Sequence, residues 1–281
     1  MCKISIITIN YNNAKEIERT IKSVITQSYK NIEYIVIDGG STDGSVELIK
    51  KYSNHISLWI SEPDKGIYNA MNKGFSYVNG DYCLFLNSGD HLTSKTSIEN
   101  IVNRGLKGDI VVCDMFIVDG LKIKCAHLLD NRPSNLYMMK YNPIPHPSTL
   151  IKKHLLERRK YHEEYKICSD WIFFFESLVL DGASYERIHL PLSVFYADGI
   201  SSSGRGNDEV QDYFASIIPS PLVKSFFITR GLNDCVYLEA ILPKYLMPFY
   251  NSFKKLLVFL ITKIIRPLKD KMYINKSRVN L

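Results

Sequence analysis

Two aspartates in the first hundred residues each follow an apolar run, at a position where a carboxylate can meet a ligand. Asp38 comes after residues 32–37, and Asp90 ends the cluster Asn87-Ser88-Gly89-Asp90 after residues 82–86. Apolar runs bounded by turn residues predict buried strands. Ligands of open α/β sheets bind beyond the carboxyl ends of strands, so Asp90 is a candidate for a metal or phosphate-linked role, and Asp38 is expected close to it at the mouth of the sheet. The alternatives are a plain loop at Asp38 and a turn in which Asp90 caps the next helix.

Two further candidates lie in the second half of the chain. His146 stands between two prolines, where the backbone is stiff and extended, and a histidine in such a loop is more often structural than catalytic. Asp170 begins a predicted helix, where an aspartate serves as a cap and is stabilised by the helix dipole. The apolar face expected for that helix consists of Trp171, Phe174, Phe175 and Leu178.

The elements that must position these residues alternate along the chain. Strands are predicted over residues 4–9, 32–37, 57–60, 82–86 and 109–115, and helices over about 14–27 and 45–52. This alternation predicts a doubly wound, mostly parallel α/β sheet. Right-handed crossovers then place the loops at Asn10 and Asp38 on one edge.

A short helix is predicted between the third and fourth strands, in a segment rich in Asp, Asn and Gly. Asp64 is expected to cap this helix. Helical spacing predicts a buried face of Ile67, Ala70, Met71, Gly74 and Phe75. An ordinary packing helix has this spacing, but it does not need so many polar residues and glycines around it.

Composition limits the class of protein. The chain has 281 residues, 46% hydrophobic and 23% charged, which suits one large or two small globular domains. Six cysteines without paired spacing indicate reduced thiols in a cytosolic protein, not a disulfide framework or a zinc site. No signal peptide is expected, because Met1-Cys2-Lys3 leads directly into a strand pattern.

The basic charge is concentrated at the C-terminus. Residues 243–281 hold nine Lys or Arg against the single acid Asp270, a net charge of +8, whereas the whole chain carries +6. The other 242 residues therefore carry −2, and no nucleic-acid partner is predicted.

The C-terminal segment is also apolar on one side. Its longest uninterrupted apolar run, residues 256–261, is too short for a membrane-spanning helix, which needs about 20 apolar residues. We predict a Lys-rich amphipathic helix that lies on an anionic membrane surface. Its apolar face would be Leu246, Phe249, Phe253, Leu256, Leu257 and Leu260. The alternative is a helix packed on the core with a solvated basic face.

Four ordered motifs resemble those of family 2 glycosyltransferases, most closely the bacterial enzymes that build O-antigen, capsule and colanic-acid repeat units. They are Thr8 to Asn12, Val36 to Asp43, Asp64 to Gly74 and Leu84 to Asp90, and the resemblance covers roughly residues 3–203. It implies the GT-A fold, with a nucleotide-sugar half over 1–115 and an acceptor half over 116–206. Residues 207–281 would form a C-terminal helical region whose basic tail begins near residue 243.

The resemblance also implies roles for individual residues. Asp90 would ligate Mn²⁺ or Mg²⁺ at the donor diphosphate, Asp170 would be the general base, and His146 would lie near the diphosphate or the acceptor. Thr8 and Tyr11 would flank the nucleotide base and Asp38 would hydrogen-bond the uracil. The expected donor site comprises Thr8, Tyr11, Asp38, Gly39, Gly66, Asn72 and Asn87.

The function implied by the resemblance is inverting transfer of a hexose or N-acetylhexosamine from a UDP-sugar. The acceptor would be an undecaprenyl-pyrophosphate-linked sugar at the cytoplasmic face of the plasma membrane. The chain departs from the family's common Asp-x-Asp-Asp, because Asn87-Ser88-Gly89-Asp90 keeps one carboxylate. Mg²⁺ or Mn²⁺ can take its remaining ligands from water and diphosphate. The alternative is a non-catalytic, sugar-nucleotide-binding scaffold at the membrane.

Overall fold

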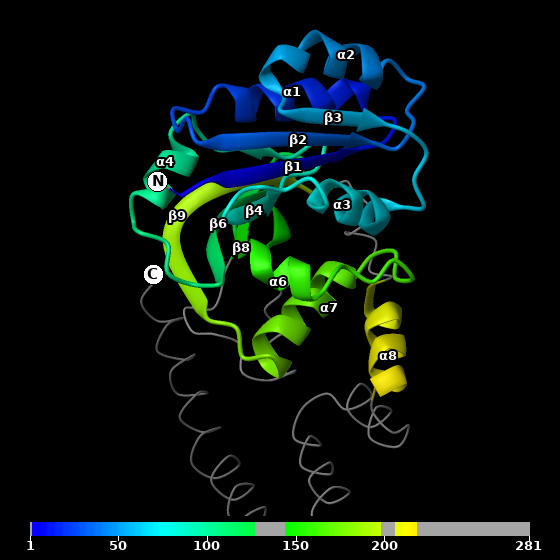
Figure 1. Ribbon diagram of the computed structural model, residues 1–281, viewed down its shortest axis with the longest axis vertical. Helices are drawn as coiled ribbons and strands as arrows, with labels where there is room; N and C mark the ends of the chain where they lie inside the picture. Colours follow the sequence, from blue (N-terminus) through cyan, green and yellow to red (C-terminus); the bar gives the residue numbers. More distant parts are fainter. Residues whose placement is uncertain (1, 127–143, 198–205, 218–281) are drawn as a thin grey trace, which may run out of the picture. The chain divides into compact units, whose positions relative to one another are not determined.

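The computed structural model describes residues 2–126, 144–197 and 206–217 (Figure 1). Residues Met1–Val210 form one compact unit and Gln211–Leu281 a second. The strands are β1 (Ile4–Asn10), β2 (Ile32–Asp38), β3 (Leu58–Ser61), β4 (Tyr82–Phe85), β5 (His91–Leu92), β6 (Ile110–Asp119), β7 (Lys122–Cys125), β8 (Thr149–Lys152) and β9 (Tyr185–Tyr196). The helices are α1 (Ala14–Ile25), α2 (Ser45–Lys51), α3 (Ile67–Phe75), α4 (Ser97–Val102), α6 (Lys153–Arg158), α7 (Ser169–Phe175) and α8 (Gly206–Ile217), with short helical turns η1 (Ser53–His55), η2 (His146–Ser148) and η3 (Glu176–Leu180).

The described strands form a single sheet in the order β3-β2-β1-β4-β8-β6-β9-β5, with β7 paired to β6. The first four strands of this order are parallel, as predicted. The sheet as a whole is mixed, however, because β8 runs antiparallel to both β4 and β6, and β5 antiparallel to β9. The prediction of a mostly parallel sheet was therefore wrong for the second half. These pairings join segments far apart in the sequence, which local periodicity cannot report.

Helices cover both faces of the first half of the sheet. Figure 1 shows α1 and α2 on one side of β1–β3 and α3 on the other. On the α1 side, Ile4 and Ile6 join Ile17 and Ile21 in the core, and all four are fully buried. The faces alternate along β1 because successive strand residues point to opposite sides of the sheet.

Close packing of α3 depends on Gly74. A Cβ atom at this position would lie 2.7 Å from Ile7 Cγ2 and 3.1 Å from Ile37 Cγ1. No side chain fits there without displacing the core, so the glycine sets the distance between α3 and the sheet.

The buried face of α3 differs from the predicted one. Ile67, expected to be buried, is 39% exposed, because it is the first residue of the helix and lies at its open end. Tyr68 and Asn72 are buried instead, under residues from the second half of the chain. Asp64 does not cap the helix, since the capping position belongs to Gly66.

The second half shows two more departures. The predicted strand 109–115 extends to Asp119, where it pairs with both β7 and β9. In α7 the buried side chains include Ile172 and Phe173, so the apolar face is wider than predicted, while Trp171 is only half-buried and stacks on Phe175.

A buried acid joins β1, β2 and the start of β4 at the amino edge of the sheet. Glu33 is 7% exposed and accepts hydrogen bonds from Ser5 Oγ (2.6 Å), Asn79 N (2.7 Å) and Lys3 Nζ (2.9 Å). Burial raises the pKa of Glu33, but these hydrogen bonds together lower it more, to about 2. The ionised carboxylate therefore stabilises this edge.

We expect Glu33→Gln to lower the free energy of unfolding by about 3 kcal/mol at neutral pH, because a pKa lowered from 4.5 to about 2 favours the folded state above pH 4.5. The wild-type advantage should disappear as the pH falls from 4.5 toward 2. Urea unfolding at several pH values measures it. The control Glu47→Gln, on the exposed part of α2, should cost less than about 1 kcal/mol. An equal loss in both variants at all pH values would contradict the assignment.

Candidate active site at the carboxyl edge of the sheet

The ends of β1, β2 and β3 meet around Asp38. In the parallel register Asn10 lies opposite Asp38, and Asp38 lies opposite Ser61. Asp38 Oδ1 accepts hydrogen bonds from Asn10 Nδ2 (2.7 Å) and Ser41 Oγ (2.6 Å). Its Oδ2 accepts three more, from Ser61 Oγ (2.7 Å), Ser41 N (2.9 Å) and Gly40 N (3.2 Å). One carboxylate thus fastens three strand ends to the loop after β2.

Asp38 is ionised although it is fully buried. Burial raises its pKa, but the hydrogen bonds from Ser41, Ser61 and Asn10 lower it further, so the pKa lies below its usual range. The resemblance implied a direct bond from Asp38 to a uracil. In this conformation the carboxylate has no exposed surface, and its visible role is to order the loops at this edge.

An exposed ring and a second carboxylate flank Gly39. Tyr11 is 65% exposed at the start of the loop after β1. A Cβ atom at Gly39 would lie 2.5 Å from Asp64 Oδ2 and 3.1 Å from Tyr11 Cδ2, so only glycine fits between them. Asp64 also accepts a hydrogen bond from Gly66 N (2.8 Å), where the backbone φ of +124° favours glycine. Sequence reasoning treated Asp64 only as a helix cap, although its place beside Gly66 in a polar motif was a usable signal.

Two of the expected donor-site residues point into the protein. Thr8 is fully buried and its hydroxyl pairs with Tyr34 Oη at 3.1 Å. Asn72 is 7% exposed. Its Nδ2 donates hydrogen bonds to Tyr161 O and Glu163 Oε1, and its Oδ1 accepts one from Tyr161 N. Asn72 therefore joins α3 to the segment 161–163, and neither side chain faces the open edge.

The loop that carries Asp90 is held by α1. Thr20 Oγ1 donates to Asp90 O (2.7 Å), and Arg19 Nη2 donates to Gly89 O (2.6 Å). The Arg19 guanidinium lies 4.1 Å from the centre of the Tyr196 ring, and Tyr196 N donates to Asp90 Oδ1 at 3.4 Å. Asp90 is followed by β5 and not by a helix, so the alternative of a helix cap is wrong.

The same loop offers oxygen ligands for a hard cation. Within the described part of the chain, Asn87 Oδ1 is buried and has no hydrogen-bond partner, which suits a ligand position. Asp90 N donates to Asn87 O at 3.0 Å, so both residues belong to one turn. Residues 2–126, 144–197 and 206–217 contain no group of three or more His, Cys, Asp or Glu that could hold a metal. A cation at Asn87 and Asp90 therefore needs further oxygens from water or a bound diphosphate.

Asp170 and His146 come together although 24 residues separate them in sequence. Asp170 Oδ2 lies 4.0 Å from His146 Nδ1, and Asp170 Oδ1 accepts a hydrogen bond from Tyr68 Oη at 2.8 Å. The N-cap of α7 is Cys168, and no side chain makes a capping hydrogen bond there, so the capping interpretation of Asp170 was wrong. Its side chain is 28% exposed, whereas that of His146 is 7% exposed. Asp170 is thus the member of the pair that solvent or a ligand can reach.

His146 is packed among aromatic rings. It stacks on Phe85 with ring centres 5.1 Å apart, and its Nε2 lies 2.8 Å from Tyr161 Oη. Burial lowers the pKa of His146 more than the nearby Asp170 carboxylate raises it. The imidazole is therefore neutral near pH 7, and it is buried away from the open site.

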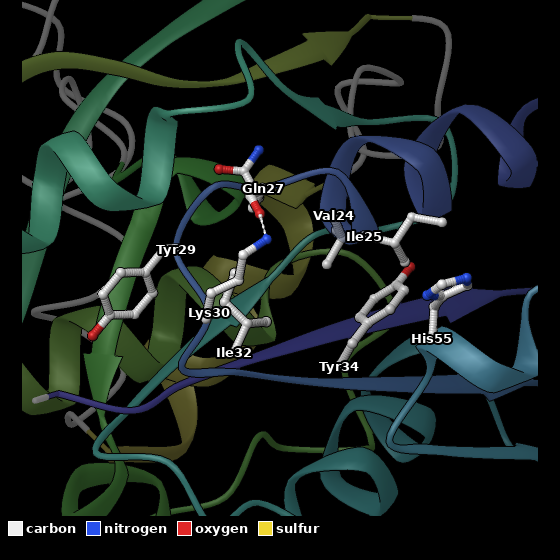
Figure 2. A pocket seen from close by; sticks show the side chains of 8 residues that line it. All are labelled: Val24, Ile25, Gln27, Tyr29, Lys30, Ile32, Tyr34 and His55. Carbon is white, nitrogen blue, oxygen red and sulfur yellow. Dashed lines mark hydrogen bonds between the residues drawn. The ribbon is translucent and has the colours of Figure 1, made fainter.

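A separate hollow of about 140 Å³ lies at the amino end of β2 (Figure 2). It is lined by Val24, Ile25, Gln27, Tyr29, Lys30, Ile32, Tyr34 and His55. None of the predicted site residues contributes to it. Asp38 stands at the other end of the same strand, so this hollow is distinct from the candidate site.

No helix in the described ranges is long and apolar enough to cross a membrane. The predicted amphipathic tail, residues 243–281, lies outside the residues that the structure describes.

Comparison with known proteins gives a family and related sequences. The family model "Glycosyl transferase family 2" matches residues 5–179. An uncharacterized glycosyltransferase of Mycobacterium tuberculosis is 41% identical over 100 residues, which cover 35% of this chain and 38% of that protein. The minor teichoic acid biosynthesis protein GgaB of Bacillus subtilis is 30% identical over 182 residues, 59% of this chain and 20% of that protein. The chain thus matches well under two thirds of the length of these relatives.

Solved structures share the fold at low sequence identity. TarS of Staphylococcus aureus, in complex with UDP-GlcNAc, has a TM-score of 0.64 at 19% identity, over 94% of this chain and 77% of that one. The mannosyltransferase PcManGT from Pyrobaculum calidifontis, in complex with GDP-Man and Mn²⁺, has a TM-score of 0.57 at 17% identity, over 96% and 88%. Because the family model matches more than half of the sequence, the chain belongs to glycosyl transferase family 2, and it has an α/β, GT-A-like fold.

Proposed function

We propose that this protein is an inverting glycosyltransferase that transfers a hexose or N-acetylhexosamine from a UDP-sugar to a lipid-pyrophosphate-linked sugar, during assembly of bacterial surface polysaccharide. The observation that carries the proposal is the partly exposed Asp170 carboxylate, held between Tyr68 and His146. TarS bound to UDP-GlcNAc supports the donor class, and the name of GgaB supports a cell-surface polymer. The lipid carrier we propose is undecaprenyl pyrophosphate.

The donor binds at the carboxyl ends of β1 and β2, in the half formed by residues 1–115. The exposed ring of Tyr11 offers a face on which a base can stack. Gly39 and Gly66 keep the backbone open beside it, and Asp64 supplies a carboxylate oxygen within reach of base or ribose donors. Asp38 orders this edge from beneath. Residues 116–206 carry Asp170 and bind the acceptor.

In the reaction, the acceptor hydroxyl attacks the anomeric carbon on the side opposite UDP. Its proton passes to Asp170, the new glycosidic bond forms, and the bond from the anomeric carbon to the diphosphate breaks with inversion. Asp90 and Asn87 Oδ1 would hold Mn²⁺ or Mg²⁺, which supplies positive charge beside the diphosphate. His146 is a positioning residue in this scheme, since it is buried and reaches the substrate only through Asp170.

A donor screen tests the function. Full-length protein with Mn²⁺ is given UDP-Glc, UDP-Gal, UDP-GlcNAc or UDP-GalNAc and a synthetic GlcNAc- or GalNAc-pyrophosphate lipid. We expect one donor to be transferred, with a β linkage read by NMR, and Asp170→Asn to reduce turnover by about 10² to 10⁴ while UDP still binds. A product that keeps the α configuration would refute inversion. Binding of UDP without turnover from any donor would favour the non-catalytic scaffold.

The metal site is tested by calorimetric titration with UDP. Mn²⁺ should tighten UDP binding to the wild type but not to Asp90→Ala, because the diphosphate then loses its charge bridge. Asn87→Ala should lose part of the Mn²⁺ effect. The control Asp81→Asn changes a carboxylate at the opposite end of β4, where it accepts a hydrogen bond from Lys3 N, and should keep the whole effect. A full Mn²⁺ effect in Asp90→Ala would place the cation elsewhere.

We also propose that residues 243–281 hold the protein at the anionic cytoplasmic face of the plasma membrane, where a lipid-linked acceptor presents its sugar. The support is the sequence alone, a charge of +8 beside an apolar pattern. Each basic residue near such a surface contributes about 1 kcal/mol, and salt weakens this part of the attraction.

Co-sedimentation with vesicles that contain anionic lipid tests the tail in the full-length protein. The triple variant Lys254→Glu, Lys255→Glu and Lys263→Glu lowers the charge of the tail from +8 to +2 and should release most of the protein from the vesicles. The control Lys30→Glu, Lys50→Glu and Lys95→Glu makes the same change of charge at exposed positions of the folded unit and should not. Equal retention of both variants, or a wild type that never pellets, would remove the membrane role.

A further inference from the structure

The hydroxyl of Tyr68 has two acceptors within hydrogen-bond distance. Tyr68 is a 5% exposed residue of α3, and its Oη lies 2.8 Å from Asp170 Oδ1 and 2.7 Å from the carbonyl oxygen of Ile167. A phenol has one hydrogen, so it donates fully to only one acceptor at a time. The second contact leaves an alternative position for that hydrogen.

The Ile167 carbonyl belongs to a segment that is itself held in place. Glu209 Oε2 accepts hydrogen bonds from Ile167 N (2.8 Å) and Cys168 N (3.0 Å), and its Oε1 accepts one from Lys166 N (2.7 Å). Burial raises the pKa of Glu209, but these backbone hydrogen bonds lower it more, so the carboxylate stays ionised. The three residues before α7 are therefore held in place, and the Ile167 carbonyl stays within reach of Tyr68 Oη.

Apart from the ionised Glu209, which accepts a hydrogen bond from Cys168 N, the titratable groups around Asp170 are neutral near pH 7. They are Tyr68 from α3, His146 from η2, and Tyr161 and Cys168 from the segment that precedes α7. Burial raises the pKa values of both tyrosines and of Cys168, and it lowers that of His146. Tyr68 therefore keeps its proton and contacts Asp170 as a neutral donor.

We propose that Tyr68 is a positioning residue for Asp170 and that its hydroxyl exchanges hydrogen-bond partners as Asp170 takes up a proton. While Asp170 is ionised, Tyr68 donates to Oδ1. When the acceptor's proton arrives on Asp170 Oδ1, the new carboxyl O–H turns to donate to Tyr68 Oη, and the phenolic hydrogen turns to the Ile167 carbonyl. No covalent bond in Tyr68 breaks, and the only proton transferred is that from the acceptor to Asp170. The inference rests on the proposed role of Asp170 as base.

This arrangement keeps the carboxyl group in one orientation in both protonation states. Without the hydroxyl, Asp170 would retain only His146 at 4.0 Å as a described polar neighbour on the other oxygen. A carboxylate free to rotate spends less time aligned with the acceptor, and small misplacements of this kind cost up to about 10² in rate. Tyr68 also belongs to the helix that begins at the Asp64 and Gly66 donor edge, so it ties the base to the donor half.

The test compares Tyr68→Phe with Tyr82→Phe, using the UDP-sugar and acceptor lipid selected by the donor screen. We expect Tyr68→Phe to lower kcat by about 10- to 100-fold, with the KM for the donor and the Kd for UDP changed less than about twofold. Tyr82→Phe also removes a buried hydroxyl, one that bonds Gly108 O at 2.7 Å, and should change none of these values.

A second variant covers the case in which Tyr68→Phe does not fold. Site-specific 3-fluorotyrosine at position 68 keeps the shape of the ring but makes the hydroxyl more acidic and a stronger donor, so kcat should change while the KM for the donor and the Kd for UDP stay within about twofold of the wild-type values. An unchanged kcat in the variant that folds, or a loss seen only in KM or UDP affinity, would overturn the inference. If the wild type transfers no sugar, the proposed function fails and this inference with it. If the wild type is active, Asp170→Asn is inactive and Tyr68→Phe is normal, only the inference fails.

Discussion

The arrangement of the candidate site depends on a buried negative charge. A carboxylate removed from water costs several kcal/mol unless hydrogen bonds replace its hydration. Asp38 meets this requirement with five hydrogen bonds from Asn10, Gly40, Ser41 and Ser61, which come from two neighbouring strands and its own loop. Because each donor must stay within about 3 Å, the loops after β1 and β2 cannot move independently. That constraint fixes the position of the loop backbone that carries Tyr11 and Gly39.

The first half of the fold was predictable because its information is local. The strands at 4–9 and 32–37 and the helix that follows each of them are predicted by periodicity, and they match β1, β2, α1 and α2 to within two residues. The second half follows from pairings between distant segments. The sequence of residues 149–152 does not predict that β8 lies antiparallel between β4 and β6. The strand is only four residues long, and its partners lie about 40 to 70 residues away in the sequence. Periodicity describes one element and carries no information about its neighbours.

The same limit applies to the site. Asp90 and Asp170 were identifiable as candidates because each stands at a predicted element boundary. Tyr68 and Glu209 could not be identified in this way. Tyr68 has the pattern of an apolar helix residue, and its role is visible only when the fold places Asp170, 102 residues later in the sequence, beside it. Asn72 differs in the opposite direction. Its place in a polar motif suggested a contact with a ligand, whereas its side-chain amide forms hydrogen bonds with the backbone of Tyr161. Residue type and spacing find groups that can do chemistry, but they do not tell which groups face a ligand and which support another residue.

The contacts of helix α3 restrict which segments can be exchanged between related proteins. Gly74 fits α3 to β1 and β2, while Tyr68 and Asn72 on the same helix bind residues 161 to 170. The helix belongs to the first half in sequence and to both halves in contacts. A recombination point drawn near residue 115 would therefore separate Tyr68 from the segment it fits. Chimeras that aim to change the acceptor while keeping the donor would have to carry α3 and residues 161–170 together from one parent, and natural divergence of acceptor preference faces the same linkage.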